Sequence, residues 1–151
     1  MDTKAAILHY CNYQERCHKE VRNKLYELGC YKEEVELLIS ELVISGVVSE
    51  ERYAKAYARG KFRMLKWGKT KIIQQLRINK ISEYCIKKAL KEIDEGEYEK
   101  TLGDLAKKKL KDLKGQRSGT AKKSKLYSFL VQKGYESKRV LELINEIIKS
   151  A

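Results

Sequence analysis

Apolar residues recur along the chain at a spacing that places them on one face of a helix. Val35, Leu38, Ile39 and Leu42 stand at i, i+3, i+4 and i+7. Two later segments repeat this spacing: Ile86, Ala89, Leu90 and Ile93, and then Val140, Leu143, Ile144 and Ile147. No segment alternates convincingly between apolar and polar residues as a strand does, and the 151 residues include no proline. The pattern therefore predicts an all-α fold.

The three apolar stripes belong to a larger repeat. Gly29, Lys80 and Gly134 are equivalent points, 51 and 54 residues apart, and each stripe begins six residues after its point. Apolar residues also stand eight and four positions before each point, namely Val21 and Leu25, Ile72 and Leu76, and Leu126 and Leu130. A further helical stretch precedes each pair, at about 4–12, 50–65 and 97–113. We therefore predict three tandem three-helix repeats in an elongated array, divided as 1–48, 49–95 and 96–151.

Turn and cap residues mark the ends of the expected helices. Gly29 and Gly134 suit the left-handed conformation that ends many helices, and Asn79, before Lys80, is the next best residue for that geometry. The residues predicted as N-caps are Ser49, Ser82 and Ser137. Residues 115–119 form a Gly/Ser-rich linker without apolar residues, which predicts an exposed, mobile loop.

The charge of the chain is basic and unevenly distributed. The chain has 33 Lys and Arg against 21 Asp and Glu, a net charge of +12, yet residues 1–48 carry 6 basic and 8 acidic groups. Eight basic residues and no acidic residue lie between Arg59 and Lys80, and residues 107–133 hold ten basic residues and one acidic residue. A charged run is usually a solvated helix face, but the acidic residues that normally interleave such a face are missing here. We therefore expect a polyanionic partner.

Other candidate chemistry is sparse. The four cysteines, at positions 11, 17, 30 and 85, form no CxxC pair, and no zinc-ligand spacing occurs, so we expect reduced thiols and no metal or cofactor. The sequence contains no phosphate-binding glycine loop, nucleophile elbow or activated carboxylate pair, and we predict no catalytic residue and no enzymatic activity. It has no secretory signal and no stretch near 18 consecutive apolar residues, so we expect a cytoplasmic protein without membrane contact. Since no long heptad seam occurs, we expect a monomer.

The candidate binding residues are the cations of the middle repeat, its tryptophan and three lysines of the third repeat. They are Arg59, Lys61, Arg63, Lys66, Trp67, Lys69, Lys71, Arg77, Lys80, Lys122, Lys123 and Lys125. Long cationic side chains are rarely buried, which favours contact with a partner. Tyr53 and Tyr57 either stack on bases or pack in the core, and their helical spacing favours the core. Trp67 either contributes to binding or plugs the loop before the next helix.

Residues 49–59 and 66–81 closely resemble the central motif of the RecX regulatory proteins. That motif has an aromatic-Ala-x-x-Tyr helix, a basic stretch and the pattern G-x-x-x-I-x-x-x-L-x-x-K-G-[IV]; the glycine corresponds to Gly68. This chain has Asn79-Lys80 where the family prefers Lys-Gly. Residues 13–25 and 125–135 are similar to the first and third modules of the family. The family is known as three tandem three-helix repeats, in agreement with the repeat described above.

The resemblance implies a bacterial modulator of the RecA recombinase. RecX-like proteins bind the RecA filament on single- or double-stranded DNA in its helical groove and restrain recombinase, ATPase and co-protease activity. Such a role belongs to DNA repair, recombination and the SOS response. Two alternatives are a generic basic helical DNA- or RNA-binding protein without a recombinase partner, and a helical scaffold for another acidic protein. The repeat and the charge alone do not separate these three functions.

Overall fold

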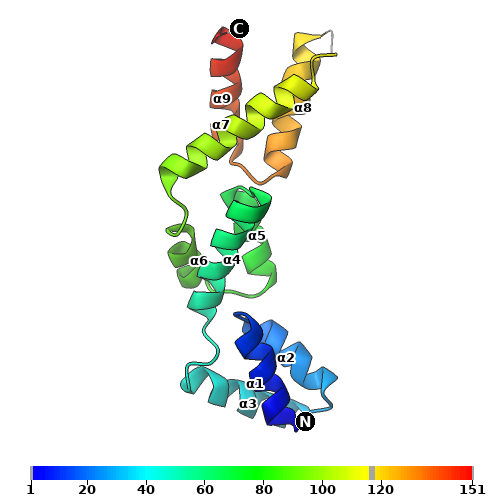
Figure 1. Ribbon diagram of the computed structural model, residues 1–151, viewed down its shortest axis with the longest axis vertical. Coiled ribbons are helices and arrows are strands. Elements are labelled where there is room, and N and C mark those ends of the chain that lie inside the picture. Colours follow the sequence, from blue (N-terminus) through cyan, green and yellow to red (C-terminus); the bar gives the residue numbers. More distant parts are fainter. Residues whose placement is uncertain (1, 116–117, 151) are drawn as a thin grey trace. The chain divides into compact units, whose positions relative to one another are not determined.

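The computed structural model describes residues 2–115 and 118–150, which form nine helices and no strand (Figure 1). The helices are α1 (Thr3–Tyr13), α2 (His18–Glu27), α3 (Lys32–Ile44), α4 (Glu50–Leu65), α5 (Lys69–Ile78), α6 (Glu83–Leu90), α7 (Glu95–Asp112), α8 (Gly119–Gln132) and α9 (Ser137–Ser150). The prediction of an all-α fold with three helices in each repeat is confirmed. Gln116 and Arg117 of the predicted linker lie outside the described residues. Within the described part, no helix has the length and apolar character needed to span a membrane.

The helices pack into two compact units. Unit 1 comprises residues 1–57 and 76–89, and unit 2 comprises residues 58–75 and 90–151. Helices α4 and α5 therefore contribute one end to each unit. The module boundaries at 48 and 95 come from the sequence repeat and stay a prediction.

The core of unit 1 lies among α1, α2 and α3. Ile7, Val21, Leu25 and Val35 are completely buried there. Tyr53 of α4 is also buried, which confirms the core assignment, whereas Tyr57 is half-buried. Burial of these spaced apolar positions supplies most of the stabilisation, because helices of this length are marginal in isolation.

The core of unit 2 lies among α7, α8 and α9. Helices α8 and α9 run antiparallel, as the orange and red ribbons of Figure 1 show. The Tyr98 ring lies 5.8 Å from the Phe62 ring and 5.1 Å from the Tyr135 ring, between centroids. Tilted aromatic pairs at these distances add favourable contacts to the area that the rings bury. Contacts among the three rings therefore connect α4, α7 and the turn between α8 and α9, residues 133–136.

The three equivalent points of the repeat adopt the same turn. The N–H groups of Cys30, Ile81 and Tyr135 donate to the carbonyls of Leu25, Leu76 and Leu130 at 3.1, 3.0 and 3.2 Å, respectively. This bond closes a Schellman motif around a left-handed residue, with φ of +94° at Gly29, +61° at Lys80 and +104° at Gly134. In the middle repeat, Lys80 and not Asn79 takes the left-handed conformation. The Asn79 amide instead donates to the Tyr53 hydroxyl at 3.0 Å.

Two of the three predicted N-caps are confirmed. The hydroxyls of Ser49 and Ser82 accept from the N–H groups of Arg52 and Cys85, each at 3.2 Å. The prediction for Ser137 is wrong by one residue. Because the Val140 N–H donates to the Glu136 carbonyl at 3.0 Å, Glu136 takes the cap position and Ser137 is the first helical residue.

Candidate functional site

The turn between α4 and α5, residues 65–70, lies at the centre of the predicted basic segment; we call it the α4–α5 turn. The first N–H groups of a helix have no partner within the helix. Here the N–H groups of Gly68 and Thr70 donate to the carbonyls of Lys133 and Gly134 at 2.8 and 2.9 Å. The Lys69 N–H donates to the Tyr98 hydroxyl at 2.9 Å. Residues from α7 and from the α8–α9 turn therefore cap the start of α5.

The same elements cap the end of α4. The Lys133 ammonium donates to the Leu65 carbonyl at 3.1 Å, and the Tyr135 hydroxyl donates to the Lys66 carbonyl at 2.8 Å. Lys66 ends α4 in the left-handed conformation, with φ of +58°. These contacts hold the backbone on both sides of Trp67.

Gly68 is the glycine of the central motif. The backbone of Gly134 comes so close to it that a side chain would not fit. A Cβ atom at Gly68 would lie 2.3 Å from the carbonyl carbon of Gly134. A Cβ atom at Gly134 would in turn lie 2.3 Å from the Cβ of Lys71. The two backbones meet so closely that neither position accepts a side chain without displacement of the α4–α5 turn.

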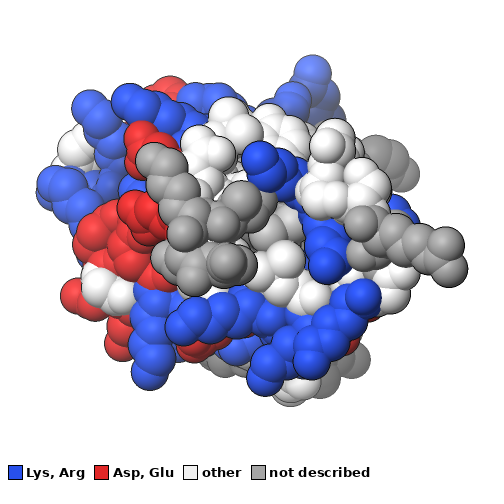
Figure 2. All heavy atoms as spheres, turned by 90° about the horizontal axis from the view of Figure 1, so that it is seen from above, with Lys and Arg blue, Asp and Glu red and all other residues white. Residues whose placement is uncertain are grey.

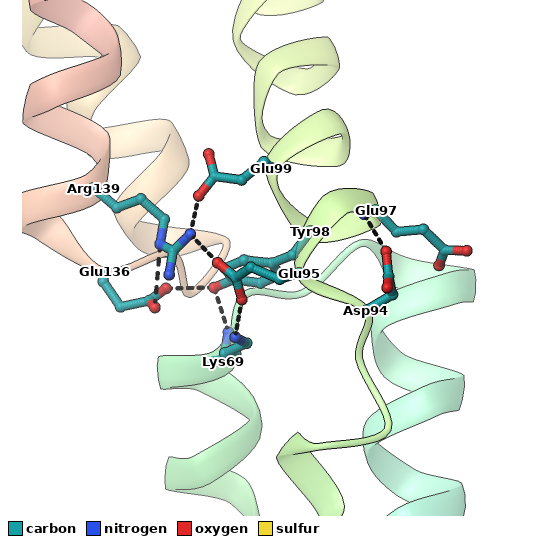
Figure 3. Close-up of polar contacts among 8 residues, drawn as sticks. All are labelled: Lys69, Asp94, Glu95, Glu97, Tyr98, Glu99, Glu136 and Arg139. Carbon is teal, nitrogen blue, oxygen red and sulfur yellow. Dashed lines mark hydrogen bonds and ion pairs between the residues drawn. The ribbon is translucent and has the colours of Figure 1, made fainter.

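A polar network around Tyr98 joins α5, α7 and α9 (Figure 3). The buried Tyr98 hydroxyl donates to the Glu136 carboxylate and accepts from the Lys69 N–H. Burial raises the pKa of Tyr98, and the hydrogen bond to Glu136 raises this pKa further, so the hydroxyl remains a proton donor at neutral pH. Arg139 of α9 pairs with Glu95 at 2.6 Å and also with Glu99 of α7.

Three of the candidate cations pair with acidic side chains. Arg59 lies 2.5 Å from Glu92, Lys69 lies 2.9 Å from Glu95, and Arg77 lies 2.7 Å from Glu83. Hydrogen bonds from Lys69 and then Arg139 lower the pKa of Glu95, and the hydrogen bond from Arg77 lowers that of Glu83. The acidic partners stand after residue 80 in the sequence. Residues 59–80 contain no acidic residue in the sequence. In the folded chain, however, carboxylates from later residues lie beside three of their cations.

Trp67 and two candidate lysines form what we call the lysine–tryptophan cluster. The Lys61 and Lys71 ammonium groups lie 5.1 and 4.7 Å from the centre of the half-buried indole ring. Both distances are within the range of a cation–π interaction. The two ammonium groups are thus less than 10 Å apart. Because this is about one Debye length at moderate salt, their potentials add.

The other candidate cations are distributed over the two units. Arg63 and Lys66 of unit 2 are exposed, as are Lys123 and Lys125 of α8, whereas Lys122 is half-buried. Lys80 is exposed in unit 1. Among the described residues, none of these six side chains has an ion-pair partner. Figure 2 looks onto the end of unit 2 formed by α7, α8 and α9, where Lys and Arg predominate and Asp and Glu gather on one side.

Metal-ligating side chains and two of the cysteines are further candidates for chemistry. Within residues 2–115 and 118–150, no group of three or more His, Cys, Asp and Glu side chains is placed to hold a metal ion. Cys11 and Cys17 are buried, and burial raises the pKa of both thiols. Since the thiolate is the reactive form, these thiols are weak nucleophiles.

Sequence reasoning missed the residues that position the α4–α5 turn, chiefly Tyr98, Lys133 and Tyr135. Their partners lie 29 to 69 residues away in the chain. A helical spacing rule does not connect residues so far apart. A signal was nevertheless present in the resemblance of residues 125–135 to the third module of the family.

The comparisons with known proteins agree with this architecture. Residues 49–90, which contain α4, α5 and α6, match a family model described as RecX, second three-helix domain. The regulatory protein RecX of Clostridium perfringens (strain 13 / Type A) is 33% identical over 122 residues, 80% of this chain and 57% of the relative. The regulatory protein RecX of Prosthecochloris aestuarii is 25% identical over 150 residues, 97% of this chain and 96% of the relative.

The chain is similar to RecX regulatory proteins over nearly its whole length. It spans little more than half of the clostridial RecX protein but nearly all of the Prosthecochloris one. The crystal structure of a regulatory protein RecX superimposes with a TM-score of 0.85 at 26% identity, covering 95% of this chain and 70% of that one. The crystal structure of RecX from Lactobacillus salivarius gives a TM-score of 0.82 at 24% identity, covering 95% and 93%. These relatives are named as regulatory proteins, and no catalytic activity is indicated.

Proposed function

We propose that this protein regulates the RecA recombinase by binding the RecA–DNA filament in its helical groove and inhibiting its recombinase, ATPase and co-protease activities. The observation that carries the proposal is the match to a regulatory protein RecX along 97% of the chain. The protein acts on the filament as a cytoplasmic monomer and modulates DNA repair and recombination.

The lysine–tryptophan cluster is the part of the surface best suited to DNA phosphates. Lys61 of α4 and Lys71 of α5 both lie at the Trp67 ring, and Trp67 is on the α4–α5 turn, whose backbone is held by hydrogen bonds. A phosphate oxyanion close to the indole ring is attracted by both ammonium groups. The rigid turn also reduces the entropy lost when the side chains engage a ligand.

The exposed cations without ion-pair partners add weaker contacts to the RecA–DNA filament. Arg63, Lys66 and the lysines of α8 are the available cations of unit 2, whereas Arg59, Lys69 and Arg77 already have carboxylate partners. Each phosphate contact adds affinity that depends on salt, and several weak contacts on one chain combine through their high effective concentration. We therefore assign Arg59, Lys69 and Arg77 mainly to the fold and the others to binding.

The proposal is tested by the ATPase activity of RecA on single-stranded DNA, titrated with this protein at moderate salt. Inhibition well below stoichiometric amounts supports control of the filament. Inhibition that begins only when the bare DNA is saturated indicates competition for phosphates by a generic nucleic-acid binder. Absence of inhibition despite DNA binding contradicts the proposal.

Two matched double variants, measured in the same assay, test whether the lysine–tryptophan cluster contributes to inhibition. Lys61→Glu with Lys71→Glu removes both cations from the indole and is expected to weaken inhibition about tenfold. Lys87→Glu with Lys91→Glu changes the net charge equally at two exposed lysines outside the cluster. Equal losses for the two double variants would assign inhibition to net charge alone. Far-ultraviolet circular dichroism of each variant checks that the helices are intact.

A further inference from the structure

Unit 2 contains a groove that the lysine–tryptophan cluster does not use. A hollow of about 520 Å³ lies between the end of α4, one face of α7 and the end of α8. A second hollow of about 280 Å³ shares Lys66, Thr101 and Asp104 with the first and continues to Glu97, near the start of α7. The two hollows form one groove along α7, which we call the α7 groove.

The α7 groove has the length of a short helix. Its lining residues on α7 run from Glu97 to Asp112, which are about 22 Å apart at 1.5 Å per residue. A ligand helix of about four turns spans this distance. A small metabolite would occupy only a fraction of it.

The wider part of the α7 groove is apolar. Met64 and Leu65 lie at its edge with exposed fractions of 82% and 44%, and Leu105 and Phe129 also line it. Large exposed apolar side chains in a groove are typical of protein-binding sites, and methionine adapts to different partner shapes. Bases and phosphates do not require such a lining.

The charges along the α7 groove are mainly positive but include carboxylates. Six cations line the two hollows, namely Arg63, Lys66, Lys100, Lys108, Lys109 and Lys133, against the three carboxylates of Glu97, Asp104 and Asp112. The excess of positive charge favours an acidic ligand. The interspersed carboxylates repel a continuous row of phosphates but leave room for a helix whose acidic residues are spaced.

We propose that the α7 groove binds an acidic amphipathic helix of the protein partner, whose apolar residues pack on Met64, Leu65 and Phe129 and whose carboxylates pair with the flanking lysines. This inference rests on the proposed function in that RecA is the partner. It divides the contacts between two surfaces of unit 2: the lysine–tryptophan cluster binds DNA, and the α7 groove binds protein. Helix-in-groove binding uses apolar anchors at i, i+3, i+4 and i+7, which suits this length.

Two substitutions in the α7 groove test the proposal. Met64→Glu places a carboxylate at the apolar edge, and Lys108→Glu reverses an exposed cation, so the double variant repels an acidic helix. The matched control combines Leu141→Glu and Lys107→Glu, because Leu141 is 50% exposed and neither residue lines the groove. Both double variants change the net charge equally and alter exposed positions of unit 2. Circular dichroism and thermal unfolding show whether each variant folds like the parent.

The binding measurements use RecA filaments assembled on oligo(dT) and the bare oligo(dT) as separate probes. We expect the groove variant to bind filaments at least about tenfold more weakly than the control, while both variants bind bare oligo(dT) equally well. Equal filament binding by groove variant and control overturns the inference. A selective loss of bare oligo(dT) binding also overturns it, because the groove would then be a nucleic-acid track.

Two further outcomes separate the possible failures. If light scattering shows a dimer of the parent chain that the groove variant abolishes, the groove binds a second copy of the chain and the inference is wrong. If the parent chain shows no preference for filaments over bare oligo(dT), the proposed function fails, and the RecA helix assigned to the groove fails with it. Filament binding by the parent together with an unaffected groove variant leaves the proposed function intact and rejects the groove alone.

Discussion

The turns at the two ends of α5 each contain a left-handed lysine but have different surroundings. The α4–α5 turn and the α5–α6 turn, residues 79–82, each contain a lysine in the left-handed conformation, with φ of +58° at Lys66 and +61° at Lys80. The α5–α6 turn is closed mainly by its own neighbours, since Lys80 and Ile81 donate to the carbonyls of Arg77 and Leu76. The α4–α5 turn has local bonds too, since Lys66 and Trp67 donate to the carbonyls of Phe62 and Lys61. In addition, residues of α7 and of the α8–α9 turn bind its backbone.

The proposed division between binding cations and structural cations follows this difference. At the α5–α6 turn, Arg77 pairs with Glu83 six residues later, and both side chains are largely exposed. Near the α4–α5 turn, Lys69 pairs with Glu95 in the network around Tyr98. Lys61 and Lys71 instead make cation–π contacts with Trp67. A distant scaffold therefore fixes the positions of cations that a local turn would leave to rotate. The following predictions test this contrast between a scaffolded turn and a local one.

Gly68→Ala is expected to have the largest effect. The added Cβ meets the Gly134 backbone, so the α4–α5 turn must move, and we expect a loss of about 3 kcal/mol in the free energy of unfolding. Gly60→Ala in α4 is the control, because its Cβ meets no atom within 4 Å and alanine favours the helix. Urea unfolding of both variants measures the difference. Equal stability of the two variants would show that the turn is not scaffolded.

Tyr98→Phe comes next. The substitution leaves the Lys69 N–H and the Glu136 carboxylate without their shared hydroxyl, and we expect a loss of about 2 kcal/mol in the free energy of unfolding. Tyr53→Phe removes one hydrogen bond with Asn79 near the local turn and should cost about 1 kcal/mol. Chemical denaturation at pH 7 compares the two. A larger loss for Tyr53→Phe would reverse the contrast.

Lys80→Gly should stabilise the protein by about 1 kcal/mol, because glycine adopts a left-handed φ without the steric cost of a Cβ. Glycine also stands at the equivalent positions 29 and 134. The gain should appear as a higher urea midpoint with an unchanged slope. A destabilised variant would indicate that the Lys80 side chain makes contacts that outweigh the backbone strain.

The smallest effect concerns pH. Lys69 and Arg139 hold the pKa of Glu95 below its ordinary value of 4.5, so Glu95 stabilises the fold above about that pH and loses this contribution as the pH falls through its lower folded pKa. Glu95→Gln should therefore flatten the decrease of melting temperature on acidification. Glu83→Gln should flatten it less, because one cation faces Glu83 instead of two. A steeper acid decrease in Glu95→Gln would contradict the assigned pairing.

The sequence predicted those features that depend on nearby residues. The helical stripes, the repeat anchored at Gly29, Lys80 and Gly134, and the caps at Ser49 and Ser82 follow from local spacing and turn chemistry. The same reasoning favoured Asn79 for the left-handed conformation, but Lys80 adopts it. The position equivalent to Gly29 and Gly134 decides which residue is left-handed, and the conformational preference of asparagine does not. It also put the α9 cap one residue late, at Ser137.

The candidate site was less accessible from the sequence, since its geometry comes from contacts between distant residues. The carboxylates that pair with Arg59 and Lys69 are 33 and 26 residues away, so the acid-free segment overstated the available positive charge. The α7 groove requires the end of α4, α7 and α8 to come together, and no spacing within one helix shows this. Lys61, Trp67 and Lys71 were all among the candidate binding residues, but their convergence on one ring requires the folded turn.

The capping of α5 by the α8–α9 turn has a consequence for synthesis of the chain. Unit 1 has all of its residues once residue 89 has left the ribosome, whereas the α4–α5 turn lacks its partners until Lys133, Gly134 and Tyr135 have emerged. Domains generally fold in the order in which they are made. The nascent chain therefore completes unit 1 first and the α4–α5 turn almost last. A truncated product carries the cations around this turn without the residues that position the turn.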